Sequence, residues 1–146
     1  MDLDTKVKLV IYQSTAEAGR PPGIDTVAQR VGASIDEIRQ SYARLAQSRL
    51  LVLESDGSSI RMAPPFSGVP TQHTVLVDGV LYHGNCAWDA LGIPAALQRS
   101  GRVQSRCEQS RRPLDLSVGP DGPEPCSWLF HCPVPAKQWW RDIVFT

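Results

Sequence analysis

The sequence has no long hydrophobic run, no excess of either charge and no closely spaced pair of cysteines. No apolar stretch approaches the roughly eighteen residues of a membrane-spanning helix, and the first residues are acidic, unlike a secretion signal. Fifteen Lys and Arg balance fifteen Asp and Glu, so no net field favours nucleic acid or anionic lipid. We therefore expect a cytoplasmic protein with neither membrane nor nucleic-acid partners.

The cysteines are few and widely spaced, at Cys86, Cys107, Cys126 and Cys132. A structural zinc site usually shows two pairs of closely spaced ligands, and disulfides are unusual in a reducing cytosol. We therefore expect free thiols, no resident metal ion and no cofactor.

Residues 1–67 predict a helical module. Apolar residues recur at helical spacing in residues 6–18, and a short helix capped by Asp25 is expected to run through Val31. Ser34 and Glu37 then form a capping box, which predicts the start of a third helix.

The third helix is expected to bury an apolar stripe and to lead directly into a hairpin. Its stripe comprises residues at helical spacing, namely Ile35, Ile38, Tyr42, Leu45 and Ala46. Two β-prone segments, 50–54 and 59–62, flank a turn-forming stretch. Three helices followed by a hairpin is the order of a winged helix.

A winged helix raises the possibility of DNA binding, with Arg39, Arg44 and Arg49 as contacts to phosphate or bases. Residues 1–66 nevertheless hold eight basic and eight acidic side chains. Asp36 and Glu37 also lie at the helix start, where a recognition helix would meet phosphate. The charges therefore favour a module that does not bind DNA.

A second unit is expected over residues 68–146, after a proline-rich linker. Asp78 and Gly79 form a two-residue turn that predicts a hairpin over residues 74–82. Further strands are expected at residues 102–107, 114–118, 127–132 and 143–146. One or two helical turns are expected at residues 135–141. The whole chain is thus predicted to be α+β, a winged-helix module followed by a small mixed-sheet domain.

Cys86 is the strongest candidate for chemistry. It follows Asn85, which we expect to cap a helix that places Cys86 in its first turn. Backbone N–H groups and the helix dipole would there lower the pKa of the thiol and make it a nucleophile and soft-metal ligand. Asp89 lies three residues on and shares its helical face, and an apolar setting would raise its pKa so that it could donate a proton.

The same two residues also allow an ordinary structural interpretation. Cys86 would then be a small buried apolar side chain, and Asp89 an acidic residue in the first turn of a helix. The spacing alone does not decide between these alternatives.

A longer pattern around this pair resembles the central motif of the alkylmercury lyase family. Its residues are Tyr82, Cys86-Ala-Trp-Asp89-Ala-Leu91, Ile93-Pro-Ala95, Gly101-Arg-Val103, Ser105 and Cys107. The resemblance implies that Cys86 and Asp89 bind mercury and cleave carbon–mercury bonds by protonolysis, with the Cys86 thiolate as mercury ligand and Asp89 as proton donor. It implies an organomercurial as substrate and a mercury ion as product. It also implies a structural role for Cys107, which we expect to be buried on a strand.

The resemblance further implies a second catalytic cysteine, which we expect in a strand beyond residues 139–146. Because the sequence ends on β-prone apolar residues, we expect it to be truncated before that cysteine. Cys126 and Cys132 are possible substitutes for the second thiol. Two other functions stay open: a non-catalytic thiol protein that binds mercury or another soft metal at Cys86, and a winged-helix regulator that responds to such a metal.

Overall fold

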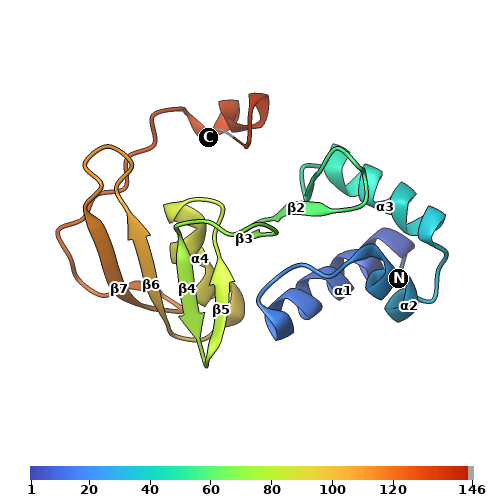
Figure 1. The fold of residues 1–146 in the computed structure, drawn as a ribbon, viewed down its shortest axis with the longest axis horizontal. Coiled ribbons are helices and arrows are strands. Elements are labelled where there is room, and N and C mark those ends of the chain that lie inside the picture. The colour runs from blue at the N-terminus through green and yellow to red at the C-terminus, as the bar shows by residue number, and fades with distance from the viewer. Residues whose placement is uncertain (145–146) are drawn as a thin grey trace.

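The computed structural model describes residues 1–144, in which three helices and a small sheet precede a larger sheet that packs with a fourth helix (Figure 1). In chain order the elements are α1 (Leu3–Ala18), α2 (Ile24–Val31), α3 (Ile35–Gln47), β1 (Val52–Leu53), β2 (Ile60–Ala63), β3 (Phe66–Ser67), β4 (Thr74–Val77), β5 (Val80–His83), α4 (Ala87–Leu97), β6 (Gly101–Arg106), β7 (Pro113–Gly119), β8 (Gly122–Pro123) and the 3₁₀ helix η1 (Ala136–Arg141).

Helices α1 and α3 begin where the sequence supplies capping groups. Asp2 accepts a hydrogen bond from the Thr5 backbone N–H at 3.0 Å, and Gly19 ends α1 with a left-handed φ of 79°. Ser34 and Glu37 form both reciprocal hydrogen bonds of the predicted capping box. Each cap satisfies backbone groups that a helix end otherwise leaves unpaired.

Two details of the helical predictions are wrong. Gly23, and not Asp25, is the N-cap residue of α2; Asp25 lies inside the first turn, where its charge still interacts favourably with the helix dipole. Ile35 was expected in the buried stripe of α3 but is 40% exposed. It is the first residue of that helix and precedes the turns that pack against α1.

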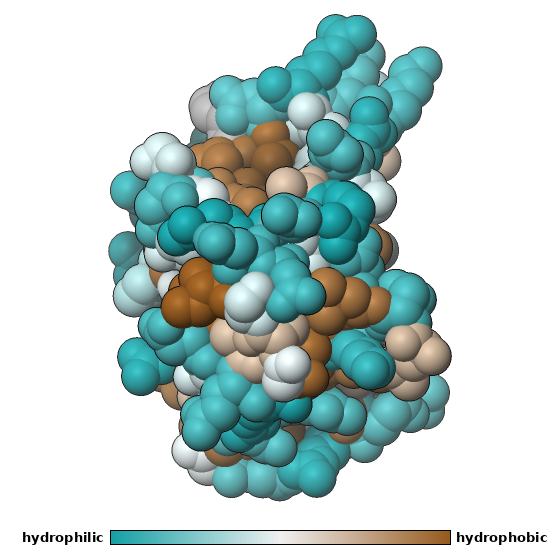
Figure 2. Space-filling model, turned by 90° about the vertical axis from the view of Figure 1, so that its right-hand side faces the viewer, coloured by the Kyte–Doolittle hydropathy of each residue, from teal (hydrophilic) through white to brown (hydrophobic). Residues whose placement is uncertain are grey.

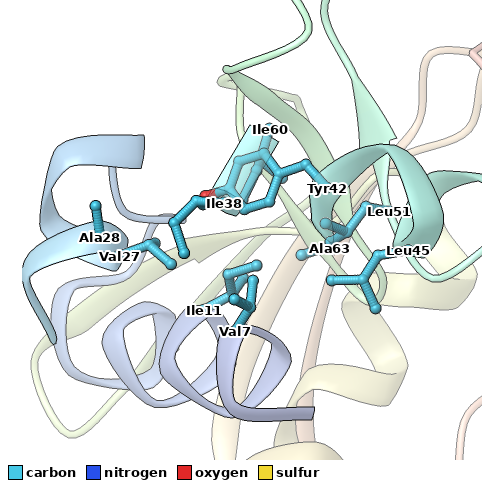
Figure 3. Packing of buried hydrophobic residues seen from close by; sticks show 10 residues of the cluster. All are labelled: Val7, Ile11, Val27, Ala28, Ile38, Tyr42, Leu45, Leu51, Ile60 and Ala63. Carbon is cyan, nitrogen blue, oxygen red and sulfur yellow. The ribbon is translucent and has the colours of Figure 1, made fainter. Parts of the chain in front are cut away.

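The first hydrophobic core lies between the three N-terminal helices and the strands that follow them (Figure 3). Its buried members are Val7, Ile11, Val27, Ala28, Ile38, Tyr42, Leu45, Leu51, Ile60 and Ala63. The predicted stripe of α3 supplies Ile38, Tyr42 and Leu45. Burial of each large apolar side chain stabilises the fold by about 1.5–3 kcal/mol, which holds the three helices together.

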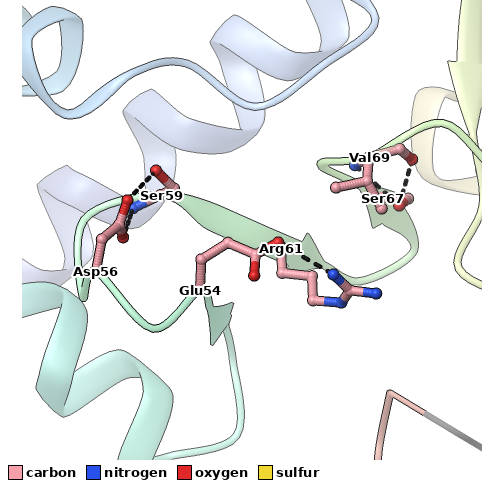
Figure 4. A network of polar contacts seen from close by, with 6 residues as sticks. All are labelled: Glu54, Asp56, Ser59, Arg61, Ser67 and Val69. Carbon is pink, nitrogen blue, oxygen red and sulfur yellow. Dashed lines mark hydrogen bonds and ion pairs between the residues drawn. The ribbon is translucent and has the colours of Figure 1, made fainter.

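A small antiparallel sheet, in the order β1-β2-β3, follows α3. In the turn between β1 and β2, Asp56 accepts hydrogen bonds from the backbone N–H groups of Ser58 and Ser59, each at 2.8 Å. Figure 4 shows the contacts between Asp56 and Ser59. Glu54 and Arg61 form an ion pair of 3.1 Å across the hairpin. A hairpin therefore follows the third helix as predicted, whereas the winged-helix assignment stays a prediction.

The larger sheet has the order β5-β4-β6-β7-β8. The β4–β5 hairpin has the predicted two-residue turn, in which Asp78 and Gly79 adopt φ values of 47° and 82°. Every pairing in this sheet is antiparallel, where the sequence predicted a mixed sheet. The β4–β5, β6–β7 and β7–β8 pairs are hairpins, which are antiparallel by construction. Strand β6 follows α4 and pairs with β4 on the side away from β5, again antiparallel.

Helix α4 packs against β4, β6 and β7 of this sheet and closes a second core. The buried members of this core are Phe66, Val75, Val77, Tyr82, Ala90, Ile93, Val103, Leu116 and Val118. The first core ends at Ala63 and the second begins at Phe66. The division of the chain at residues 67 and 68 stays a prediction.

Helix α1 and strand β5 join the two halves of the chain. Tyr82 donates a hydrogen bond from its hydroxyl to the backbone oxygen of Ala16 at 2.5 Å. Gly19 approaches the same strand so closely that a Cβ there would lie 2.3 Å from the backbone oxygen of Leu81. Tyr12 packs against both cores. The helical module therefore rests directly on the second unit.

The segment after β8 departs from the prediction. Residues 127–132 form no strand and pair with no neighbouring strand among residues 1–144. Pro125 and Pro133, which lack a backbone N–H, lie on either side of the segment. The predicted helical turns at 135–141 are confirmed as η1. Of the strand expected at 143–146, the first two residues form a turn and the last two lie outside the described residues.

No helix within residues 1–144 is both long enough and apolar enough to cross a membrane.

Candidate active site around Cys86 and Asp89

The candidate site begins where β5 passes into α4. Cys86 is itself the N-cap residue of α4, so the prediction that Asn85 caps this helix is wrong. The carbonyl of Cys86 accepts the Ala90 backbone N–H at 3.0 Å. Gly84 permits the tight connection, because a Cβ there would lie 2.6 Å from the Ala90 nitrogen. The thiol is thereby held at the start of the helix, half-buried.

Asn85 instead orients the carboxyl group of Asp89. Its side-chain nitrogen donates to Asp89 Oδ2 at 2.9 Å and to the backbone oxygen of Phe66 at 3.3 Å. Phe66 belongs to β3, so a residue of the small sheet supports the carboxyl of α4. The predicted pair and a third polar side chain therefore form one continuous site.

Burial is the main influence on the pKa values of both groups. It raises the pKa of Asp89, as predicted, although the hydrogen bonds from Asn85 act in the opposite direction. It also raises the pKa of the Cys86 thiol, so the prediction of an activated, low-pKa thiolate is wrong. The backbone N–H groups of Asp89 and Trp88 do lower this pKa, but desolvation outweighs them and the charge of Asp89 adds to the increase.

Tyr12 reaches this site from α1, at the other end of the sequence. Its hydroxyl donates to the backbone oxygen of Pro64 at 2.9 Å, and its ring lies 6.3 Å from that of Phe66. Burial raises the pKa of Tyr12, and the charge of Asp89 raises it further, which places the two groups within electrostatic reach. Nothing in the sequence around Tyr12 marks this role, since it depends on a contact between distant segments.

The segment beyond β8 brings another thiol toward Cys86. The rings of Trp88 and Phe130 lie 5.3 Å apart. Cys132 lies two residues further on, close enough to Cys86 for an electrostatic interaction that contributes to the raised pKa of Cys86. The indole N–H of Trp139 donates to the backbone oxygen of Val134 at 2.7 Å, and the same nitrogen lies 3.2 Å from Cys132 Sγ.

The other two cysteines lie apart from this arrangement. Cys126 is exposed. Cys107 is neither on a strand nor fully buried, because β6 ends one residue earlier, so the expectation of a buried strand thiol is wrong. Hydrogen bonds from Ser110 lower the pKa of Cys107, including a backbone N–H that lies 3.5 Å from its sulfur.

Among residues 1–144, no three His, Cys, Asp or Glu side chains are close enough to form a metal-binding group. The site consists of the Cys86 thiol, the Asp89 carboxyl group, whose pKa is raised by burial, and the Cys132 thiol on a neighbouring segment. Such a set defines a protein that can bind a soft electrophile through sulfur and supply a proton beside it.

Comparison with known proteins identifies the family. The alkylmercury lyase family model matches residues 66–146, which is more than half of the chain. The chain therefore belongs to the alkylmercury lyase family. The alkylmercury lyase of Streptomyces lividans is 31% identical over 103 residues, which cover 70% of this chain and 46% of that protein. The enzyme of Bacillus cereus is 27% identical over 103 residues, covering 70% of this chain and 45% of that protein.

A solved structure described as the mercury-bound form of MerB2 shares the fold. It superposes with a TM-score of 0.65 at 19% sequence identity, over 84% of this chain and 60% of that chain. The chain spans about half the length of the curated relatives that it matches.

Proposed function

We propose that this protein cleaves the carbon–mercury bond of organomercurials by protonolysis, with Cys86 as the mercury ligand and Asp89 as the proton donor. The observation that carries the proposal is the half-buried carboxyl with a raised pKa, held three residues from a thiol at the start of α4. Membership of the alkylmercury lyase family supports the same reaction class.

The reaction balances with two thiols and one carboxylic acid. Cys86 sulfur displaces the weaker ligand of the organomercurial, and that ligand leaves with the thiol proton. Asp89 then gives its proton to the carbon, and the electron pair of the carbon–mercury bond becomes the new carbon–hydrogen bond. A second thiol binds mercury through sulfur and returns its own proton to Asp89. Mercury stays divalent throughout, so no oxidant or reductant is needed.

Cys132 is the better candidate for the second thiol among the described residues. It lies on the segment that packs against Trp88 and is within electrostatic reach of Cys86. Cys126 is exposed and has no such relation to the site. Cys132 also donates its S–H to the backbone oxygen of Val134 at 2.8 Å, and this hydrogen bond must break before its sulfur can bind mercury.

Headspace gas chromatography of benzene released from phenylmercury tests the proposal. Cys86→Ser is expected to abolish benzene release and to lower mercury uptake by one equivalent, because the other three thiols still bind mercury. Asp89→Asn should keep the full uptake and lose most of the release. Cys107→Ser is the matched control, because it removes a thiol outside the site. Release that survives Cys86→Ser would refute the proposal.

The same assay separates the candidates for the second thiol. Cys132→Ser should slow benzene release while one mercury still binds per Cys86, and Cys126→Ser should leave the rate unchanged. The opposite pattern would assign the role to Cys126. If both variants keep the full rate, neither cysteine acts and the second sulfur comes from added thiol or from elsewhere.

Mercury capture without cleavage is the second candidate function, and the raised pKa of Cys86 favours it. A buried thiol with a high pKa reacts slowly as a nucleophile, yet it still exchanges onto mercury because the sulfur–mercury bond is strong. Mercury retention after desalting with no hydrocarbon in the headspace would identify this function.

A further inference from the structure

We propose that Asn85 is the positioning residue for the proton donor, selecting which oxygen of Asp89 carries the proton. The inference rests on the proposed function and adds to it a third polar side chain. Neither the sequence pattern nor the family match assigns this role to Asn85. The role follows from the two hydrogen bonds that the Asn85 side-chain nitrogen donates, one to Asp89 and one to the backbone oxygen of Phe66.

The orientation of the Asn85 amide follows from its neighbours. Its NH₂ group has two hydrogens, and they are used by the Phe66 backbone oxygen at 3.3 Å and by Asp89 Oδ2 at 2.9 Å. A flipped amide would place its oxygen against the Phe66 carbonyl, which can only accept hydrogen bonds. Asn85 Oδ1 is buried and has no hydrogen-bond partner among the described residues, so the donated bonds alone fix this side chain.

A fixed donor makes the two oxygens of Asp89 unequal. Oδ2 already accepts a hydrogen from Asn85, and a proton placed on Oδ2 would compete with that hydrogen bond. The proton of the neutral acid is therefore carried on Oδ1. A general acid must present its proton toward the reacting atom, so a choice between the two oxygens bears directly on proton transfer.

The position of Phe66, whose backbone oxygen accepts a hydrogen bond from Asn85, is fixed by contacts with both halves of the chain. Its ring lies 6.3 Å from Tyr12 of α1 and 5.7 Å from Tyr82 of β5. Its backbone oxygen is therefore held by packing from both halves of the chain. Because Asn85 is hydrogen-bonded both to this oxygen and to Asp89, it limits the movement of the Asp89 carboxyl group. A general acid needs such a fixed position relative to the reacting atom.

The composition of the chain allows a direct test, because Asn85 is its only asparagine. Protein labelled with ¹⁵N-asparagine should give one side-chain NH₂ signal pair in an NMR spectrum. We expect this pair to shift with pH at a midpoint above the ordinary aspartate value of about 3.9. The shift should disappear in Asp89→Ala. A pair that does not titrate, or that titrates equally in Asp89→Ala, would overturn the proposal.

The catalytic arm of the test uses Asn85→Leu. The rate of hydrocarbon release should fall by up to about 100-fold while mercury uptake is kept, since the acid is misoriented and not removed. Loss of the donated hydrogen bonds should raise the pKa of Asp89, so the decline in rate at high pH should begin at a higher pH. An unchanged pH profile would show a merely structural role.

Gln104→Leu is the matched control. It removes an amide that contacts the carboxyl of Asp115 at 3.5 Å on the exposed part of β6 and β7. It should change neither the rate nor its pH profile. If Asn85→Leu does not fold, the NMR titration of the unaltered protein still decides the proposal. If Asp89→Ala keeps full hydrocarbon release, while the Asn85 NH₂ signals of the unaltered protein shift with pH, the proposed function fails. The proposal that Asn85 positions the carboxyl group of Asp89 then still stands.

Discussion

Cys86 shows how burial and helix position oppose one another at a single residue. The start of a helix stabilises a thiolate, but removal of the sulfur from water destabilises it, and here the second effect is larger. The thiol therefore stays protonated at neutral pH until a soft ligand replaces the proton. A sulfur kept in this state resists oxidation, which depends on the thiolate.

We predict that alkylation of Cys86 will follow a pKa above the value of about 8.5 for a free cysteine. The rate of iodoacetamide labelling against pH, with the peptide identified by mass spectrometry, measures this pKa. Exposed Cys126 provides an internal comparison and should label faster at neutral pH. A midpoint for Cys86 at or below 8.5 would contradict the effect of burial.

Asp89→Asn should reduce hydrocarbon release by about 10²–10⁴-fold, the usual contribution of a general acid. In the unaltered protein the reaction needs the protonated carboxyl, so the rate should fall as pH rises through the pKa of Asp89. Burial moves that fall to a higher pH than an ordinary aspartate would give. Rates measured across pH at saturating organomercurial provide the check, and a rate that rises continuously with pH would exclude Asp89 as the acid.

At the scale of elements, some predictions that rest on local chemistry were confirmed, whereas the helix caps expected at Asp25 and Asn85 were wrong. The capping box of Ser34 and Glu37 and the turn at Asp78 and Gly79 each depend on residues close in sequence. The strand expected at 127–132 failed because alternation of residue types does not ensure a partner strand. Sheet formation requires a neighbour that supplies hydrogen bonds, which a local pattern does not contain.

The residues of the candidate site also differ in whether local sequence could predict them. The proximity of Cys86 and Asp89 could be predicted, because they lie three residues apart at the start of one helix, but only the resemblance to a family pointed to their chemistry. The roles of Asn85 and Tyr12 could not be predicted, since both depend on the backbone between Pro64 and Phe66. The direction of the Cys86 pKa shift also depends on how deeply tertiary packing buries the sulfur.

Two glycines near α4 should respond oppositely to alanine. Gly84→Ala should destabilise the protein by about 1–3 kcal/mol, because its Cβ would meet the Ala90 nitrogen at 2.6 Å. Gly92→Ala should stabilise it by about 0.5–1 kcal/mol, since Gly92 lies inside α4 with nothing within 4 Å of the added carbon. Urea denaturation measures both changes, and an equal response would contradict the close approach at Gly84.

At the scale of the whole molecule, two of the arginines considered for DNA contacts, Arg44 and Arg49, make contacts within the protein. Arg44 forms two hydrogen bonds with Asp4, at 2.7 and 2.8 Å, and these lower the pKa of Asp4 to about 2. The Arg49 guanidinium lies 5.9 Å from the centre of the Trp140 ring. On the face shown in Figure 2, hydrophilic residues surround separate hydrophobic patches.

We predict that the protein does not bind DNA. Its balanced charge and the pairing of Arg44 leave little positive potential to attract phosphate. Fluorescence anisotropy with a labelled duplex at low salt should show binding no stronger than that of a neutral control protein. Sub-micromolar binding that weakens steeply with added salt would instead support the regulator hypothesis.

The contact between α1 and β5 also predicts how the molecule unfolds. Tyr82 and Gly19 join the two cores without an intervening linker, so the cores are expected to lose their structure together. The four tryptophans all lie after residue 87, whereas three of the four α-helices described lie before residue 48. Tryptophan fluorescence and far-UV circular dichroism therefore report on different halves, and their denaturation midpoints should coincide if unfolding is cooperative. Tyr82→Phe, which removes only the hydroxyl that bonds to Ala16, should lower both midpoints equally; separated midpoints would reveal two independent folding units.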